Sequence, residues 1–276
     1  MAALTSLGCR AQNDFLSSVR YDKAGEETFC KVAGALEAHR DLPRAELLLL
    51  AAEQFLGTEY VAGTLEQEPE RLTIDLCRTD CILFVEMCLA MVQTVQSDSV
   101  TFENFCRNTQ NLRYRGGVVA GYPSRNHYTS GWIAQGEQAG VFTEVSRQLG
   151  GVPLRQEFNF MSTHPASYPQ LSDDPAAVEE IREVERQLSQ LKYWYLPQSD
   201  ITALCEGVRE GDIICFVTPV AGLDIGHVAI AARSGDQMHF IHASTKAGKV
   251  VLDSQSIADY VLTHKSARGI RVLRLN

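Results

Sequence analysis

A cysteine and several histidines lie at positions from which they can carry out acyl transfer. Cys81 follows Thr79-Asp80 and precedes the apolar run Ile82-Leu83-Phe84-Val85. This pattern predicts that Cys81 lies in the first turn of a helix. Unpaired backbone N–H groups and the positive end of the helix dipole stabilise a thiolate there. Cys81 is therefore the candidate nucleophile.

His227 is the candidate base, because Gly226-His227-Val228-Ala229-Ile230 places it at the start of a predicted strand. A thiol, an imidazole and a third polar group are the minimum set for cysteine-mediated acyl transfer. The third group is His239 or His242. If the hairpin around Ser234-Gly235-Asp236 closes with a two- or four-residue loop, His242 shares a sheet face with His227, whereas a three-residue loop selects His239.

The same residues make a poor metal site. His239 and His242 lie three apart on a predicted strand, so they face opposite sides of the sheet. Cys77 and Cys81 are not supported as zinc ligands by any C-x-x-C pair or H-x-x-x-H helix. We therefore expect neither a metal ion nor a cofactor.

Helices precede strands along the chain. Apolar residues at helical spacing predict helices over Pro43 to Leu56 and from Thr79-Asp80 to about Val95. Asp173-Asp174-Pro175 predicts the start of a third helix that ends near Leu191. Segments rich in Val, Ile and Phe then predict strands: Asp212 to Thr218, His227 to Arg233, Gln237 to Ala243, Lys249 to Leu252 and Gly269 to Leu275. This order predicts an α+β fold.

Residues 111–151 are rich in Gly, Tyr, Arg and Asn and only weakly periodic, so we interpret them as an insertion that carries surface chemistry. The rings of Tyr114, Tyr128 and Trp132 can pack on sugars, while Arg125 and His127 can bond hydroxyl and carboxyl groups. The alternative is that these residues tie the insertion to the core. We expect a single domain over residues 13–276, with an inserted subdomain at about residues 100–200.

Length and charge narrow the classes of function. A chain of 276 residues with 45% hydrophobic residues can bury one sizeable core. Its net charge of −9 argues against a nucleic-acid partner, because phosphate-binding proteins usually carry a basic face. No apolar run approaches the roughly 20 residues that span a bilayer, so we expect no stable membrane span. Eight cysteines are too sparse for a disulfide scaffold.

Residues 1–12 resemble the end of an export signal that lacks its charged start. They contain a degenerate lipobox at Cys9 and a small-residue cleavage site at Ala11. Export would place the protein in the cell envelope, in the periplasm, with or without a lipid anchor. The start as written predicts a cytoplasmic protein instead, and we favour export.

Three segments resemble the signature blocks of the NlpC-type papain-like cysteine peptidases, in the same order. They are Asp80-Cys81, Gly226-His227-Val228-Ala229-Ile230 and Phe240-Ile241-His242-Ala243-Ser244. Gly57-Thr58-Glu59-Tyr60 is similar to the Tyr-bearing element that precedes the nucleophile in that superfamily. The resemblance implies a papain-like core, with N-terminal helices packed on an antiparallel sheet and a helical or loop insertion. It also implies His242 as the third residue.

Further segments resemble an amidase-like branch of that superfamily, formerly a domain of unknown function. They are Asn111-Leu112-Arg113-Tyr114-Arg115, Gly121-Tyr122-Pro123-Ser124-Arg125-Asn126-His127-Tyr128, Trp132 and Gly222-Leu223-Asp224-Ile225. The resemblance implies an N-acetylmuramoyl-L-alanine amidase that prefers anhydro-muramyl peptides. His227 would take the proton from Cys81, and His242 would orient the imidazole and favour its charged form. The backbone N–H of Cys81 would stabilise the oxyanion.

The resemblance also sets the expected partner and binding residues. We expect the partner to be a peptidoglycan-derived disaccharide peptide and the enzyme to be a monomer. The expected substrate contacts come from two groups of residues, those beside the nucleophile or base and those of the insertion. They are Tyr60, Asp80, Asp224, Arg125, His127, Tyr128 and Trp132.

Three alternatives to this amidase remain. The superfamily nucleophile is typically followed by Ser-Gly or Thr, whereas Cys81 is followed by Ile82-Leu83. This difference favours an amidase over a γ-D-glutamyl-diamino acid endopeptidase. An inactive muropeptide-binding module is disfavoured because all three polar positions are present. A thiol-dependent acyltransferase would need an acyl acceptor that the sequence does not reveal.

Overall fold

One mixed sheet organises the chain, for which a computed structural model describes residues 15–276. Its strand order is β2-β1-β9-β8-β7-β6-β10-β5-β4, and β3 pairs with β10. The pairs are antiparallel except for β1 with β2. The strands are β1 (Glu59–Tyr60), β2 (Arg78–Thr79), β3 (Phe142–Glu144), β4 (Val152–Leu154), β5 (Tyr193–Pro197), β6 (Ile213–Val217), β7 (Ile225–Ser234), β8 (Gln237–Ser244), β9 (Lys249–Leu252) and β10 (Gly269–Leu275).

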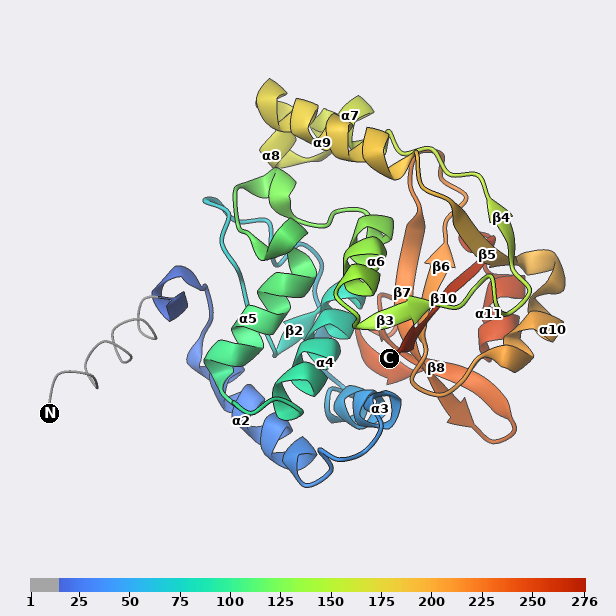
Figure 1. Cartoon of the computed structure of the whole chain (residues 1–276), viewed down its shortest axis with the longest axis horizontal. Helices are drawn as coiled ribbons and strands as arrows, with labels where there is room; N and C mark the ends of the chain where they lie inside the picture. The colour runs from blue at the N-terminus through green and yellow to red at the C-terminus, as the bar shows by residue number, and fades with distance from the viewer. Residues whose placement is uncertain (1–14) are drawn as a thin grey trace, which may run out of the picture.

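Helices cover both faces of this sheet (Figure 1). One layer contains α2 (Lys23–Glu37), α3 (Arg44–Gln54), α4 (Cys81–Val95), α5 (Phe102–Arg113) and α6 (Thr129–Gln138). The opposite face carries α10 (Ile201–Leu204) and α11 (Ile257–Thr263). A third group, at the top of Figure 1, contains α7 (Phe160–Thr163), α8 (Pro169–Ser172) and α9 (Pro175–Leu188). The predicted α+β class is confirmed.

Alternate residues of the central strands face the two helical layers. In β6, Ile213 and Cys215 pack with helices α2 to α6, whereas Ile214 and Phe216 pack with α10 and α11. Because both faces are covered, the strand is an unbroken apolar run rather than an alternating one. Helix α4 lies at the centre of its layer and is buried on nearly all sides, as expected for a helix that is apolar all round.

The predicted helices over residues 43–56 and 79–95 and the helix that begins at Pro175 are confirmed, as are the five predicted strands. Residues 111–151, which are only weakly periodic in sequence, contain α6 and β3. Glycine lowers helix propensity, but Gly136 packs so closely on the ring of Phe142 that a Cβ would clash there. Tertiary packing thus overrides the local preference.

Residues 100–200 share the main core in several places. Helix α5 packs with α4, and strands β3 and β5 pair with β10. The proposed export-signal remnant at residues 1–12 lies outside the described residues. Within residues 15–276, no helix has both the length and the apolar character needed to cross a bilayer.

Candidate active site

Cys81 is the first residue of α4, and Asp80 fixes the helix start at this position. The carboxylate of Asp80 accepts a hydrogen bond from the Leu83 N–H at 3.0 Å, which satisfies one of the free donors of the first turn. The thiol of Cys81 is half-buried, and the backbone N–H of Ile82 lowers its pKa. The sequence pattern therefore places a cysteine beside the free N–H groups of a helix N-terminus.

The sheet opens where α4 meets it. Strands β7 and β8 pair from Ser234↔Gln237 to Ile230↔Ile241, whereas residues 225–229 of β7 pair with β6 alone. Beside this stretch, which lacks a β8 partner, the backbone N–H of Val228 acts on the Cys81 thiol and lowers its pKa. The candidate nucleophile thus lies near the backbone directly after His227.

The β7–β8 hairpin decides between His239 and His242. Ser234 pairs with Gln237, so the loop is the two residues Gly235-Asp236, and Gly235 has the positive φ of 60° that such a turn requires. This is the loop length for which His242 shares a face with His227. His239 faces the other side, where its Nδ1 lies 3.0 Å from the carbonyl oxygen of Asp253.

A chain of hydrogen bonds runs from His227 to Asp253. His227 Nε2 lies 2.7 Å from His242 Nδ1, and His242 Nε2 lies 3.1 Å from Asp253 Oδ2. A carboxylate can only accept, so we assign the proton on His242 to Nε2 and its lone pair to Nδ1. His227 then donates from Nε2. Its Nδ1 is left as the basic nitrogen.

Asp253 is absent from the residues identified in the sequence. It follows β9, in which Val251 pairs with His242, so Asp253 lies diagonally across from His242 on the same face. The sequence shows an aspartate at the end of a predicted strand. It does not show which strand lies beside β8. Within residues 15–276, no three His, Cys, Asp or Glu side chains are grouped so as to hold a metal ion.

Cys81, His227, His242 and Asp253 line one cleft of about 910 Å³. Tyr60 of β1 and Tyr260 of α11 add aromatic groups to its walls, as does His264 directly after α11. The turn between β8 and β9 contributes Lys246, the one Lys or Arg side chain of the lining. Asp253 is the one carboxylate of the lining.

Burial controls the protonation of the candidate pair. Loss of hydration raises the pKa of the Cys81 thiol to about 12, and the Asp80 carboxylate adds to this rise. The N–H groups of Val228 and Ile82 act in the opposite direction. Burial also lowers the pKa of His227 to about 3, with a contribution from His242. Both shifts favour a neutral thiol and a neutral imidazole in the free site.

The directions of these shifts run against two electrostatic expectations. The helix N-terminus was expected to favour a thiolate at Cys81, but desolvation outweighs the N–H groups there. His242 was expected to favour the charged form of His227, but a second imidazole disfavours a positive charge beside it. Burial lowers the pKa of His242, and the Asp253 carboxylate acts in the opposite direction.

Residues 50–270 match the AmiA-like family, described as N-acetylmuramoyl-L-alanine amidase-like. The chain belongs to this amidase-like family. An N-acetylmuramoyl-L-alanine amidase from Bacteroides uniformis has a similar structure with a TM-score of 0.80 and 33% identity, covering 84% of this chain and 99% of its own. The chain is accordingly an amidase-like hydrolase.

Two further solved structures resemble this amidase-like chain. A structure from Bacteroides fragilis, whose description proposes a xylanase, is 37% identical, has a TM-score of 0.77, and covers 81% of this chain and 99% of its own. A protein from Legionella pneumophila at 19% identity has a TM-score of 0.69 over 92% of this chain and 97% of its own, which shows a shared fold. No curated protein matches the chain.

Tyr60 and Asp80 lie next to the candidate nucleophile of this amidase-like protein. Tyr60 lines the cleft, and its pKa is raised by burial and by the neighbouring Cys81 and Asp80. Asp80 does not line the cleft and instead caps α4, and burial raises the pKa of its carboxyl group. Tyr60 is thus placed to contact a substrate, whereas Asp80 holds the helix that carries Cys81.

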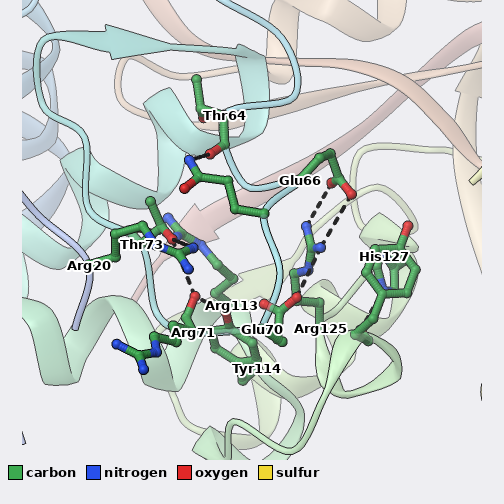
Figure 2. Close-up of polar contacts among 12 residues, drawn as sticks. Arg20, Thr64, Glu66, Glu70, Arg71, Thr73, Arg113, Tyr114, Arg125 and His127 are labelled. Atoms are coloured by element: carbon green, nitrogen blue, oxygen red, sulfur yellow. Dashed lines mark hydrogen bonds and ion pairs between the residues drawn. The ribbon is translucent and has the colours of Figure 1, made fainter. Parts of the chain in front are cut away.

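Arg125 and His127 lie in a buried polar cluster outside the cleft lining (Figure 2). Arg125 forms ion pairs with Glu66 at 2.9 Å and with Glu70 at 3.1 Å. His127 Nε2 lies 2.8 Å from the carbonyl oxygen of Tyr122. Burial, together with the charge of Arg125, lowers the pKa of His127 to about 3. Arg125 thus holds the segment 61–71 against residues 114–127, whereas His127 bonds within the second segment.

Tyr128, Trp132 and Asp224 are also buried away from the cleft. The Tyr128 hydroxyl donates to Glu185 at 2.6 Å, and Asp224 accepts from the Ser130 N–H at 2.6 Å. The indole of Trp132 is 2% exposed, so it offers no face to a sugar ring. For these residues and for Arg125 and His127, the structure favours the alternative in which they tie residues 111–151 to the core.

Proposed function

We propose that this protein is a cysteine-dependent N-acetylmuramoyl-L-alanine amidase with a papain-like core of the NlpC type. The observation that carries the proposal is the meeting of Cys81, at a helix N-terminus, with the hydrogen-bonded chain His227–His242–Asp253 in one cleft. The family match to amidase-like proteins supports the choice of an amide bond. That bond joins the lactyl carbonyl of N-acetylmuramic acid, or of its anhydro form, to L-alanine.

The reaction begins with proton transfer between the two neutral groups. His227 Nδ1 takes the proton of the Cys81 thiol as the sulfur attacks the lactyl carbonyl carbon. The backbone N–H of Cys81, at the start of α4, stabilises the oxyanion. His227 then protonates the departing amine of L-alanine, which leaves a thioester. Water that has lost a proton to His227 hydrolyses this thioester and releases the sugar carboxylate and the free thiol.

Asp253 compensates the positive charge that develops during this reaction. An imidazole with a low pKa is a poor base on its own. The Asp253 carboxylate raises the pKa of His242 and accepts its Nε2–H, so the dyad of histidines shares one negative partner. The negative charge of Asp253 thereby offsets the unfavourable effect of His242 on a positive charge at His227 when the thiol proton arrives.

The proposed substrate is an anhydro-muramyl peptide released from peptidoglycan. The proposed enzyme is a monomer that acts in the periplasm. The cleft of about 910 Å³ is wide enough for a ligand larger than a dipeptide. The pattern of residues 1–12 supports export, and the segments 111–115 and 121–128 support the amidase branch with its anhydro preference. Such an enzyme would act in the recycling of muropeptides.

Two other activities receive less support from the site. A glycosidase, which the Bacteroides fragilis description suggests, needs a pair of carboxyl groups that flank the scissile bond. Asp253 is the one carboxylate of the cleft lining, and it is bonded to His242. The endopeptidase alternative is disfavoured by Ile82-Leu83, which replace the polar residues that typically follow the nucleophile.

Mass spectrometry of digests tests the proposal. Anhydro-muramyl tetrapeptide is incubated with the wild type, Cys81→Ala and the control Cys77→Ala, whose exposed thiol lies 3.7 Å from the Thr28 hydroxyl and outside the cleft lining. Free sugar and intact tetrapeptide are expected from the wild type and from Cys77→Ala, but not from Cys81→Ala. A muramyl dipeptide product would move the cut to the endopeptidase position. Binding without any cleavage would show an inactive module.

A further inference from the structure

An aromatic stack forms part of the cleft wall outside the proposed catalytic groups. The rings of Tyr260 and His264 lie 3.8 Å apart with an interplanar angle of 13°, and both residues line the cleft. His264 Nδ1 lies 2.9 Å from the carbonyl oxygen of Tyr260, which fixes the imidazole one helical turn beyond the tyrosine. The mechanism proposed above gives this pair no role.

The stack is anchored to the strands that carry the histidines. The ring of Tyr260 lies 4.9 Å from that of Phe216, 5.1 Å from that of Phe240 and 6.5 Å from that of His242. Tyr260 is therefore held against β6 and β8, and His264 covers one of its faces. Among the described residues, His264 has no second ring contact and no hydrogen bond at Nε2. One imidazole face and one ring nitrogen remain for a ligand.

The chemistry of a muropeptide indicates which half of it fits such a wall. Pyranose rings present flat C–H faces that pack on aromatic rings, and hydroxyl groups that bond a ring nitrogen. A stem peptide of alanine, glutamate and a diamino acid has no flat apolar group and carries carboxylates. Building on the proposed amidase function, we propose that His264, supported by Tyr260, binds the saccharide of the substrate and selects substrates that retain it.

The same local arrangement also occurs outside the cleft. The rings of Phe160 and His164 lie 4.4 Å apart at 16°, and His164 Nδ1 lies 2.9 Å from the Phe160 carbonyl oxygen. A threonine hydroxyl contacts Nδ1 in both cases. The stack by itself is thus a way to end a helix, and only the pair at residue 264 lines the cleft. His164 is therefore a matched control.

The test is the ratio of effects on two substrates. The value of kcat/KM is measured for the wild type, His264→Ala, His264→Phe and His164→Ala, on the disaccharide anhydro-muramyl tetrapeptide and on D-lactyl-tetrapeptide, which keeps the scissile amide without sugars. His264→Ala is expected to lose about 5-fold more on the sugar-bearing substrate, mainly through KM. His264→Phe, which keeps a ring, is expected to recover most of this loss. His164→Ala is expected to change neither the kcat/KM on each substrate nor the ratio of the two values.

Binding of the free disaccharide gives a second readout that needs no turnover. Isothermal titration is expected to show weaker disaccharide binding by His264→Ala than by the wild type and His164→Ala. An equal loss on both substrates, or unchanged disaccharide binding, would overturn the saccharide role. A wild type that cuts neither substrate would refute the amidase function instead, and the titration would still decide the role of His264.

Discussion

At the scale of single residues, the site combines a half-buried thiol with a half-buried imidazole, and loss of hydration disfavours the charged form of each. The helix N-terminus and the N–H of Val228 reduce this effect at Cys81 without cancelling it. In the proposed mechanism, the Cys81 thiol is therefore protected in the free protein and becomes reactive when a base removes its proton during attack.

The reactivity of Cys81 toward iodoacetamide should reflect this protection. Because the thiolate is the reacting form and the pKa of Cys81 is raised to about 12, its alkylation rate should rise from pH 7 to pH 10 without a plateau. Peptide mass spectrometry resolves the Cys81 peptide from those of the other cysteines. A rate that levels off below pH 8 would show instead that the free site holds an ion pair.

Asp253 should matter for rate far more than for folding. In Asp253→Asn, the side-chain amide can donate to His242 Nε2. His242 then carries its proton on Nδ1, the atom to which His227 Nε2 must donate. We expect kcat to fall by about 10² to 10⁴ at every pH, as for orienting carboxylates in related triads. Asp259→Asn is the control, because Asp259 lies on α11 outside the cleft lining. Wild-type kcat in Asp253→Asn would exclude this orienting role.

The residue types explain what sequence reasoning reached and what it missed. Cys81 and His227 carry visible local signals, a helix start and a strand start. Asp253 has only its place at the end of a predicted strand, and its role depends on β9 pairing with β8. Arg125 and Trp132 attracted a binding role because their side chains suit sugars, but a long polar or aromatic side chain serves equally well to join two segments in a core.

At the scale of elements, the start of α4 and the opening between β7 and β8 create the site together. The helix start was visible in the sequence through Asp80-Cys81, and strands β6 to β10 through their apolar runs. The opening was not, because it depends on where the β7–β8 ladder stops. Helix α11, which carries Tyr260, was also missed. It is only seven residues long and is held chiefly by packing of Ile257 and Val261.

The cap at Asp80 should couple helix stability to activity. Asp80→Ala removes the bond to the Leu83 N–H and should lower the free energy of unfolding by about 1 kcal/mol. It should also lower activity, because Cys81 is the next residue. Asp22→Ala, which removes the equivalent cap of α2 at Gly25, should destabilise similarly with full activity. Urea unfolding and turnover measure both quantities. Full activity of a destabilised Asp80→Ala variant would show that the helix cap does not support the activity of Cys81.

At the scale of the whole molecule, buried ion pairs hold distant segments together around the sheet. Arg113 pairs with Glu86 of α4 at 2.8 Å, and Arg271 of β10 pairs with Glu144 of β3 at 2.7 Å. Arg125 joins the segment before β2 to the turn before α6 in the same way (Figure 2). No local pattern predicts these pairs, since their members lie far apart in the sequence.

Loss of Arg125 should destabilise the fold rather than remove a substrate contact. Arg125→Ala leaves the buried Glu70 without its ion pair, and an uncompensated buried charge typically costs about 3–5 kcal/mol. Arg182→Ala, which removes an exposed ion pair on α9, should change the free energy of unfolding by less than about 0.5 kcal/mol. Urea unfolding compares the two variants. If Arg125→Ala is stable and has a raised KM, Arg125 contacts the substrate after all.

Acid should destabilise the protein in part through His127. Its pKa is lowered to about 3 in the fold, whereas an unfolded histidine titrates near about 6.5. Between these values the unfolded state binds the extra proton, so the free energy of unfolding rises with pH up to about 6.5 and gains nothing above it. His127→Gln, which can still donate to the Tyr122 carbonyl, should weaken this dependence by at most about 1.4 kcal/mol per pH unit. Urea unfolding from pH 4 to pH 8 measures it, with exposed His39→Gln as control. Equal slopes for His127→Gln and the wild type would mean that His127 is protonated in the fold.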